Sequence, residues 1–106
     1  MKPVIASIVL TAGLAFAGNA MSAAMPEVAR KSGCVMCHSI DKKLVGPAWQ
    51  AIADKYKGDA TAADKLSAKI AKGGSGVWGA MPMPPQSKVS EADIKELVTF
   101  ILGLAK

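Results

Sequence analysis

The stretch Cys34-Val35-Met36-Cys37-His38 decides the fold, because it brings two thiols and an imidazole into one short segment. Two cysteines three positions apart on a helical turn present their sulfurs to nearly the same side. Both sulfurs can then bond to the two vinyl groups of one haem, while the adjacent His38 coordinates the iron from one face. The pattern C-x-x-C-H is typical of covalent c-type haem attachment. We therefore expect one haem c whose iron is bound by His38.

Other uses of two cysteines and a histidine fit this chain less well. A structural zinc site usually takes four protein ligands, whereas the whole sequence contains 2 Cys and 1 His. A redox disulfide of the thioredoxin type requires a strand–helix setting, and no segment here alternates with the period of a strand. A structural disulfide across such a small loop would add little stability. The pattern favours haem attachment over all three.

The N-terminal segment has the pattern of a secretory signal peptide. Lys2 gives a positive start, and residues 4–17, VIASIVLTAGLAFA, carry no charge. This apolar run is too short for a bilayer core, which needs ~20 residues, and it lacks the polar face of a packed surface helix. Small residues suited to signal peptidase follow, with cleavage possible after Ala20, Ala23 or Ala24. We predict that residues 1–23 are a cleaved signal peptide and that residues 24–106 form the exported, periplasmic domain, without a membrane span.

Length and charge predict one small domain with no nucleic-acid partner. The 106 residues include 13 Lys and Arg against 8 Asp and Glu, so the loss of Lys2 leaves a net charge of +4. The basic residues are scattered, whereas nucleic-acid binding would require a basic stripe or a known motif. Small domains bury less of their surface, and a covalent apolar group would supply the contact area that such a chain lacks. We expect a monomer.

Helical periodicity and helix-terminal residues predict four short helices. Pro26 is tolerated at a helix start, and Thr61 and Ser90 are residue types that cap helix N-termini. The last helix carries a broad apolar stripe, so it is expected to pack against several other elements. The expected helices cover residues 26–33, residues 47–57, residues 62–72 after Thr61, and residues 91–105 after Ser90.

Residues 73–86, GGSGVWGAMPMPPQ, are predicted to form a long loop with no strand. The segment is rich in Gly and Pro, yet it carries Trp78, Met81 and Met83. A flexible linker would not carry these apolar side chains, so the loop is expected to wrap around something.

A second ligand for the iron has to come from a methionine, because His38 is the sole histidine. Haems in electron-transfer cytochromes commonly pair His with Met. Four of the six methionines lie in the signal segment, at the new terminus or between the two cysteines, which leaves Met81 and Met83. Each precedes a proline and is therefore biased toward an extended backbone. The residues alone do not decide between the two methionines, so both stay open as the second ligand.

Three segments together resemble the small bacterial class I cytochromes c of the c-551/c-552 type. These are residues 33–53, GCVMCHSIDKKLVGPAWQAIA, residues 69–86, KIAKGGSGVWGAMPMPPQ, and the final helix. The likeness covers about residues 25–106. It implies an all-α class I cytochrome c fold, with about four short helices wrapped around one covalent haem.

The resemblance also implies roles for residues close to the iron. It implies Met83, the Met of the PMPP segment, as the distal ligand and leaves Met81 to packing. It further implies that the carbonyl of Pro47 accepts a hydrogen bond from the second ring nitrogen of His38. Such a bond fixes the tautomer of the ligand and makes it more basic.

Three more positions match residues that approach the rest of the haem in this family. Trp78 matches an indole that donates to a haem propionate, and Lys69 falls where a basic residue approaches the same group. Gln86 falls where a side-chain amide can approach the sulfur of the axial methionine, a position at which many relatives carry Asn. The expected haem-binding set is therefore Cys34, Cys37, His38, Met83, Pro47, Trp78, Lys69 and Gln86.

The function that follows is one-electron transfer in a respiratory chain and not catalysis. If His38 and Met83 fill both axial positions, no site on the iron is open to a substrate. The partners of similar proteins include nitrite reductase, cytochrome c peroxidase, a terminal oxidase and bc1-type donors. Such redox encounters use small, transient interfaces, and lysines near the haem edge would steer them. The alternative is a ligand-binding or peroxidatic haem protein in which the distal Met83 is labile.

Overall fold

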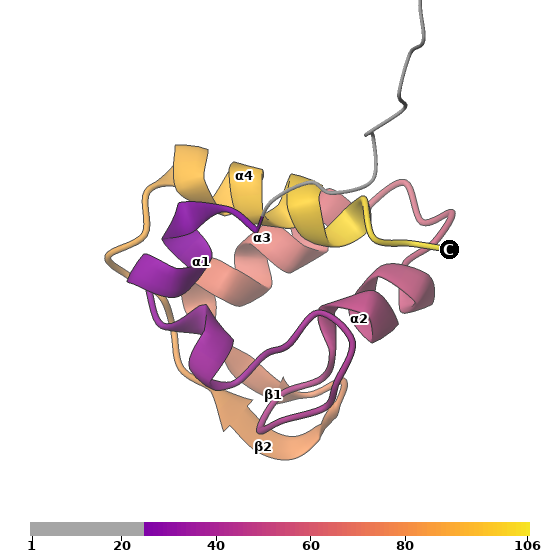
Figure 1. The fold of residues 1–106 in the computed structure, drawn as a ribbon, viewed down its shortest axis with the longest axis horizontal. Coiled ribbons are helices and arrows are strands. Elements are labelled where there is room, and N and C mark those ends of the chain that lie inside the picture. The colour runs from indigo at the N-terminus through magenta and orange to yellow at the C-terminus, as the bar shows by residue number, and fades with distance from the viewer. Residues whose placement is uncertain (1–24) are drawn as a thin grey trace, which may run out of the picture.

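The computed structural model describes residues 25–106. The predicted signal peptide, residues 1–23, lies outside the described residues. As Figure 1 shows, the described residues fold into four helices and one small hairpin, so the fold is mostly helical and agrees with the predicted all-α class except for the hairpin. No helix between residues 25 and 106 is long and apolar enough to cross a membrane. In chain order the elements are α1 Glu27–Lys31, a 3₁₀ turn Cys34–Met36, α2 Trp49–Lys55, α3 Ala62–Lys72, β1 Gly74–Gly76, β2 Gly79–Met83 and α4 Glu91–Leu102.

The predicted helices are all present, although α2 begins at Trp49, two residues after the predicted start, and α1 begins one residue after Pro26. The two predicted caps have different outcomes. The Oγ of Ser90 accepts a hydrogen bond from the Asp93 amide at 3.2 Å, so the predicted cap of α4 is confirmed. Thr61 precedes α3 but makes no side-chain cap, so that prediction is wrong. Its hydroxyl and its amide both donate to Asp59 instead, at 2.7 Å and 2.8 Å. The Asp59 carboxylate accepts both bonds, and the bond from the hydroxyl holds the Thr61 side chain toward Asp59.

The segment predicted as an unbroken loop contains an antiparallel hairpin, which corrects the prediction of no strand. β1 pairs with β2 in the register Gly74 with Met83 and Gly76 with Gly79. Glycine dominates these strands, so no alternation of side chains announces them in the sequence. The hairpin ends at Met83 and therefore fixes where the two methionines of β2 lie.

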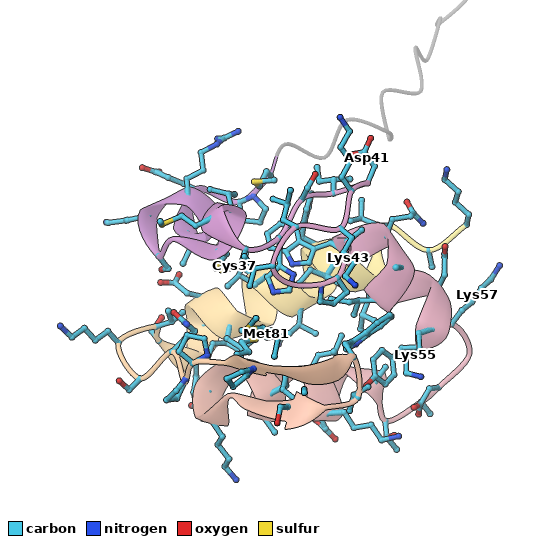
Figure 2. The ribbon with its side chains drawn as sticks, turned by 90° about the horizontal axis from the view of Figure 1, so that it is seen from below. Cys37, Asp41, Lys43, Lys55, Lys57 and Met81 are labelled. Atoms are coloured by element: carbon cyan, nitrogen blue, oxygen red, sulfur yellow. The ribbon has the colours of Figure 1, made fainter. Side chains whose placement is uncertain are left out.

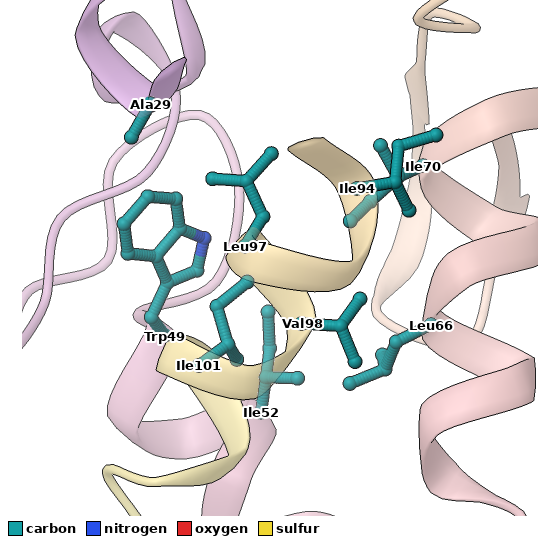
Figure 3. Close-up of a cluster of buried hydrophobic side chains, with 9 residues drawn as sticks. All are labelled: Ala29, Trp49, Ile52, Leu66, Ile70, Ile94, Leu97, Val98 and Ile101. Carbon is teal, nitrogen blue, oxygen red and sulfur yellow. The ribbon is translucent and has the colours of Figure 1, made fainter. Parts of the chain in front are cut away.

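The hydrophobic core lies around α4, which packs against α1, α2 and α3. Figure 3 shows α4 at the centre of the cluster, with side chains that face α2 on one side and α3 on the other. Trp49 of α2 meets Phe100 of α4 edge to face, with ring centroids 5.9 Å apart. The buried side chains are Ala29, Trp49, Ile52, Leu66, Ile70, Ile94, Leu97, Val98 and Ile101.

Candidate haem site

A cavity of about 520 Å³ lies between the segment that follows the 3₁₀ turn, α3 and the hairpin. This is within the ~300–1,000 Å³ typical of ligand pockets. Cys37 and His38 line one side, and the hairpin residues Trp78, Met81 and Met83 line another. The charged residues among those that line it are Lys65, Lys69 and Lys72, all on α3. The cavity is thus bordered by ligand-type side chains and by one basic wall.

The 3₁₀ turn presents the two cysteines. It begins after Gly33, whose φ of 76° lies in the left-handed region that glycine adopts at little cost. The amides of Cys37 and His38 both donate to the carbonyl of Cys34, at 3.2 Å and 2.9 Å. Both thiols are half-buried and are not joined by a disulfide. Burial raises the pKa of the Cys34 thiol. The turn therefore holds two cysteines and the histidine in one rigid unit.

The imidazole of His38 is fixed from several directions. Its Nδ1 lies 2.7 Å from the carbonyl oxygen of Pro47, the contact that the resemblance implied. A carbonyl only accepts, so Nδ1 carries the proton and Nε2 keeps its lone pair for a metal. The ring stacks on Trp49, with centroids 5.9 Å apart and planes at 23°. Behind the ring lies Gly46, where a Cβ would be 2.6 Å from the His38 Cε1. The amide of Gly46 is itself held by the carbonyl of Cys37, at 2.8 Å.

The two methionines of β2 lie in different surroundings. Both line the cavity, but Met83 is half-buried and packs against the hydrophobic core. Met81 is 66% exposed, and Figure 2 shows it on the hairpin, across from Cys37. The backbone near Met83 is in close contact with α3, since a Cβ on Gly73 would lie 2.4 Å from the Met83 carbonyl oxygen.

The remaining three residues expected at the site divide into two groups. Trp78 and Lys69 line the cavity. The Nζ of Lys55 lies 5.7 Å from the centroid of the Trp78 ring, a cation–π distance that stabilises an indole by ~0.5–1 kcal/mol at exposed sites. Gln86 is not among the described residues that line the cavity, and its Nε2 donates to the Pro84 carbonyl at 3.1 Å. The structure shows this backbone contact for Gln86, and its approach to the methionine sulfur stays a prediction.

Three further residues at the site were given no role by the sequence. Gly46 lies in the quoted VGP segment and Gly73 in the quoted GGSG segment, but only the fold reveals how closely each approaches its neighbour. Lys55 and Trp78 are far apart in the sequence, so no local motif predicts their contact.

The residues present fit a c-type haem. Cys37, His38 and Met83 line the same cavity, whereas Cys34 lies in the preceding 3₁₀ turn and is not among the lining residues. A thiol, an imidazole and a thioether are the donor types of a covalently held, axially ligated iron. The lysines on α3 suit the carboxylates of the haem propionates.

Comparison with known proteins gives the same result. The family model described as "Cytochrome c" matches residues 22–105. Cytochrome c-551 of Allochromatium vinosum is 57% identical over 77 residues, which are 73% of this chain and 82% of that protein. Cytochrome c-552 of Hydrogenobacter thermophilus is 43% identical and covers 97% of each chain. The crystal structure of Nitrosomonas europaea cytochrome c552 superposes with a TM-score of 0.70 at 49% identity, over 73% of this chain and 95% of that one.

Proposed function

Because the chain belongs to the cytochrome c family and is therefore a haem c electron carrier, we propose that His38 and Met83 are the two axial ligands of its iron. We propose further that the protein acts in the periplasm, between respiratory redox partners. The observation that carries the proposal is the bond of the His38 Nδ1 to the Pro47 carbonyl, since it leaves the Nε2 lone pair for the iron at a cavity that both His38 and Met83 line.

The chain's own residues keep the coordination constant. When bound, haem c supplies a one-electron iron couple. Pro47 holds the His38 tautomer, Gly46 lies against the ring and Trp49 stacks on it, so the imidazole has little freedom to move. A ligand that stays in place through both oxidation states needs little reorganisation, and this favours rapid electron transfer.

Burial supports Met83 over Met81 as the second ligand. A thioether is a weak donor and competes poorly with water when it is solvated. Met83 is half-buried against the core, whereas Met81 is 66% exposed. A Met ligand in an apolar pocket also favours the reduced iron and raises the potential.

The basic wall of the cavity supports a place for the two propionates. Lys69 and Lys72 line the cavity from α3, and Trp78 lines it from the hairpin with its indole near Lys55. Lysine cations and an indole N–H are donors that suit carboxylates. These residues would orient the propionate side of the group.

The location and the partners are proposed from charge and from the N-terminal pattern. Residues 1–23 have the features of a signal peptide, which sends a chain to the compartment where c-type haem attachment and disulfide-permissive chemistry occur in bacteria. A net positive charge steers an acidic partner and makes the association rate fall as salt rises. We expect weak, transient docking to respiratory redox proteins.

Two single substitutions in the haem-loaded protein test the ligand assignment. Oxidised wild-type protein should show the weak long-wavelength charge-transfer band of sulfur-to-iron ligation. Met83→Ala should lose this band, and the matched variant Met81→Ala should keep it. The reverse result would make Met81 the ligand. Absence of the band from the wild type would instead favour a ligand-binding or peroxidatic haem protein.

A further inference from the structure

The C-terminal end of α3 lies in unusually close contact with the segment that carries Met83. Gly73 follows α3 with φ 67° and ψ −160°. A Cβ at this position would lie 2.4 Å from the Met83 carbonyl oxygen, 2.7 Å from the Pro85 nitrogen and 2.9 Å from the Pro84 carbonyl carbon. All three neighbours are backbone atoms, so no side-chain rotation could relieve the overlap.

Hydrogen bonds on both sides of this contact hold the two segments together. The amide of Gly73 donates to the Lys69 carbonyl at 2.7 Å and so ends α3. On the other side, the amide of Gln86 donates to the Ile70 carbonyl at 3.0 Å. Met83 is thus fixed between its hairpin pairing with Gly74 and this second bond to α3. The backbone of residues 83–86 has no open direction toward α3.

We propose that Gly73 is a positioning residue for Met83, because its missing side chain sets how closely the Met83 backbone lies to α3. The inference rests on the proposed ligation by Met83. Non-bonded heavy atoms settle at about 3.5 Å, so a Cβ at position 73 would displace the Met83 carbonyl by roughly 1 Å. A misplacement of ~1 Å in a functional group can cost about 100-fold. A thioether bound weakly to iron is sensitive to such a shift.

Gly73→Ala in the haem-loaded protein tests the proposal, with Gly58→Ala as the matched control. Gly58 lies between α2 and α3 with φ 81°, is not among the residues that line the cavity, and a Cβ there would meet nothing within 4 Å. Both variants therefore share the strain of a side chain at positive φ, and only Gly73→Ala adds the overlap. We expect Gly73→Ala to lose most of the sulfur-to-iron band and to bind carbon monoxide, when reduced, up to about 100-fold faster than the wild type.

The control separates positioning from loss of stability. Gly58→Ala should lower the denaturant midpoint while keeping the band and the slow carbon monoxide binding of the wild type. If Gly73→Ala keeps the band as well as Gly58→Ala does, the proposal is overturned. If the wild type itself lacks the band, it is the proposed ligation by Met83 that fails.

A second pair of variants decides the matter if Gly73→Ala yields no haem protein. Gln86→Pro removes the amide that donates to Ile70 without adding bulk at Gly73. Gln86→Ala keeps that amide and removes only the side chain. Because both variants lack the glutamine side chain, their difference isolates the backbone bond. The proposal expects carbon monoxide to bind about tenfold or more faster in Gln86→Pro than in Gln86→Ala. Equal rates in the two variants would refute it.

Discussion

Gly46→Ala is the substitution whose effect follows most directly from the geometry around His38. Gly46 is not among the glycines with positive φ, so alanine does not have to adopt a left-handed backbone there. The added Cβ would lie 2.6 Å from Cε1, 3.0 Å from Nδ1 and 3.1 Å from Nε2 of the ring. The overlap with the imidazole is therefore the main expected effect on the folded state.

The size of the effect follows from these distances. Carbon atoms settle about 3.5 Å apart, so the ring has to move by roughly 1 Å. The His38 Nδ1 lies 2.7 Å from the carbonyl oxygen of Pro47, the residue after Gly46. A ring shift of this size would lengthen that distance to about 3.6 Å, at which no hydrogen bond remains. Loss of this hydrogen bond leaves the half-buried Pro47 carbonyl unpaired, which lowers the stability by ~1–3 kcal/mol. Replacing glycine by alanine also lowers the conformational entropy of the unfolded chain, which raises the stability by ~0.4–1 kcal/mol. We expect a net destabilisation of about 1–2 kcal/mol.

The reduction potential should change with the stability. Without the bond to Pro47 the imidazole of His38 is less basic. Lower basicity weakens the bond to oxidised iron more than the bond to reduced iron. A tenfold preferential weakening of the oxidised form raises a one-electron potential by about 59 mV. Voltammetry of the haem-loaded variant should therefore show a rise on the order of 60 mV, with unfolding measured by denaturant titration.

Gly103→Ala is the control for Gly46→Ala. Gly103 has φ −66° and lies at the end of α4, where a Cβ would come no closer than 3.2 Å to a neighbouring atom. This variant should leave the potential unchanged. If Gly46→Ala also leaves both the potential and the stability at wild-type values, the proposed effect of the Gly46 contact on the His38 imidazole is refuted.

Two further predictions concern the hydrophobic core and the loss of stability at low pH. Leu97→Ala should destabilise the protein by ~2–5 kcal/mol in denaturant titrations, because Leu97 is 1% exposed at the centre of the core; the exposed neighbour Glu96→Ala should change little. Hydrogen bonds from Thr61 and Lys65 lower the pKa of Asp59 from 3.8 to about 2. A depressed carboxyl pKa stabilises the fold above about pH 4, and this contribution is lost as the pH falls toward 2. In Asp59→Asn the free energy of unfolding should therefore depend less on pH between about pH 4 and pH 2. The same pH dependence in the variant and the wild type would contradict a lowered pKa of Asp59.

The sequence predicted the helices and the chemistry of the attachment segment because both are encoded locally. Ser90 and the apolar stripe of α4 lie within a few residues of the structure that they specify. The spacing of Cys34, Cys37 and His38 likewise carries its meaning in one turn. Local patterns of this kind require no knowledge of how the chain folds back on itself.

The features that sequence reasoning missed depend on contacts between distant segments or on residues without side chains. The hairpin contains Gly74, Gly76 and Gly79, so it has too few side chains to show a two-residue period. The contacts of Gly46 with His38 and of Gly73 with Met83 are made by the absence of a Cβ, which only three-dimensional proximity reveals. Elimination left two methionines as candidates, and the difference in their burial emerges from the fold.

Carbon monoxide binding to the reduced wild-type protein tests closed coordination most directly, with Met83→Ala as the reference. If His38 and Met83 hold both axial positions, the wild type should bind carbon monoxide far more slowly than Met83→Ala, in which one position is open. Immediate binding by the wild type, at the rate of the variant, would contradict a closed, six-coordinate electron carrier.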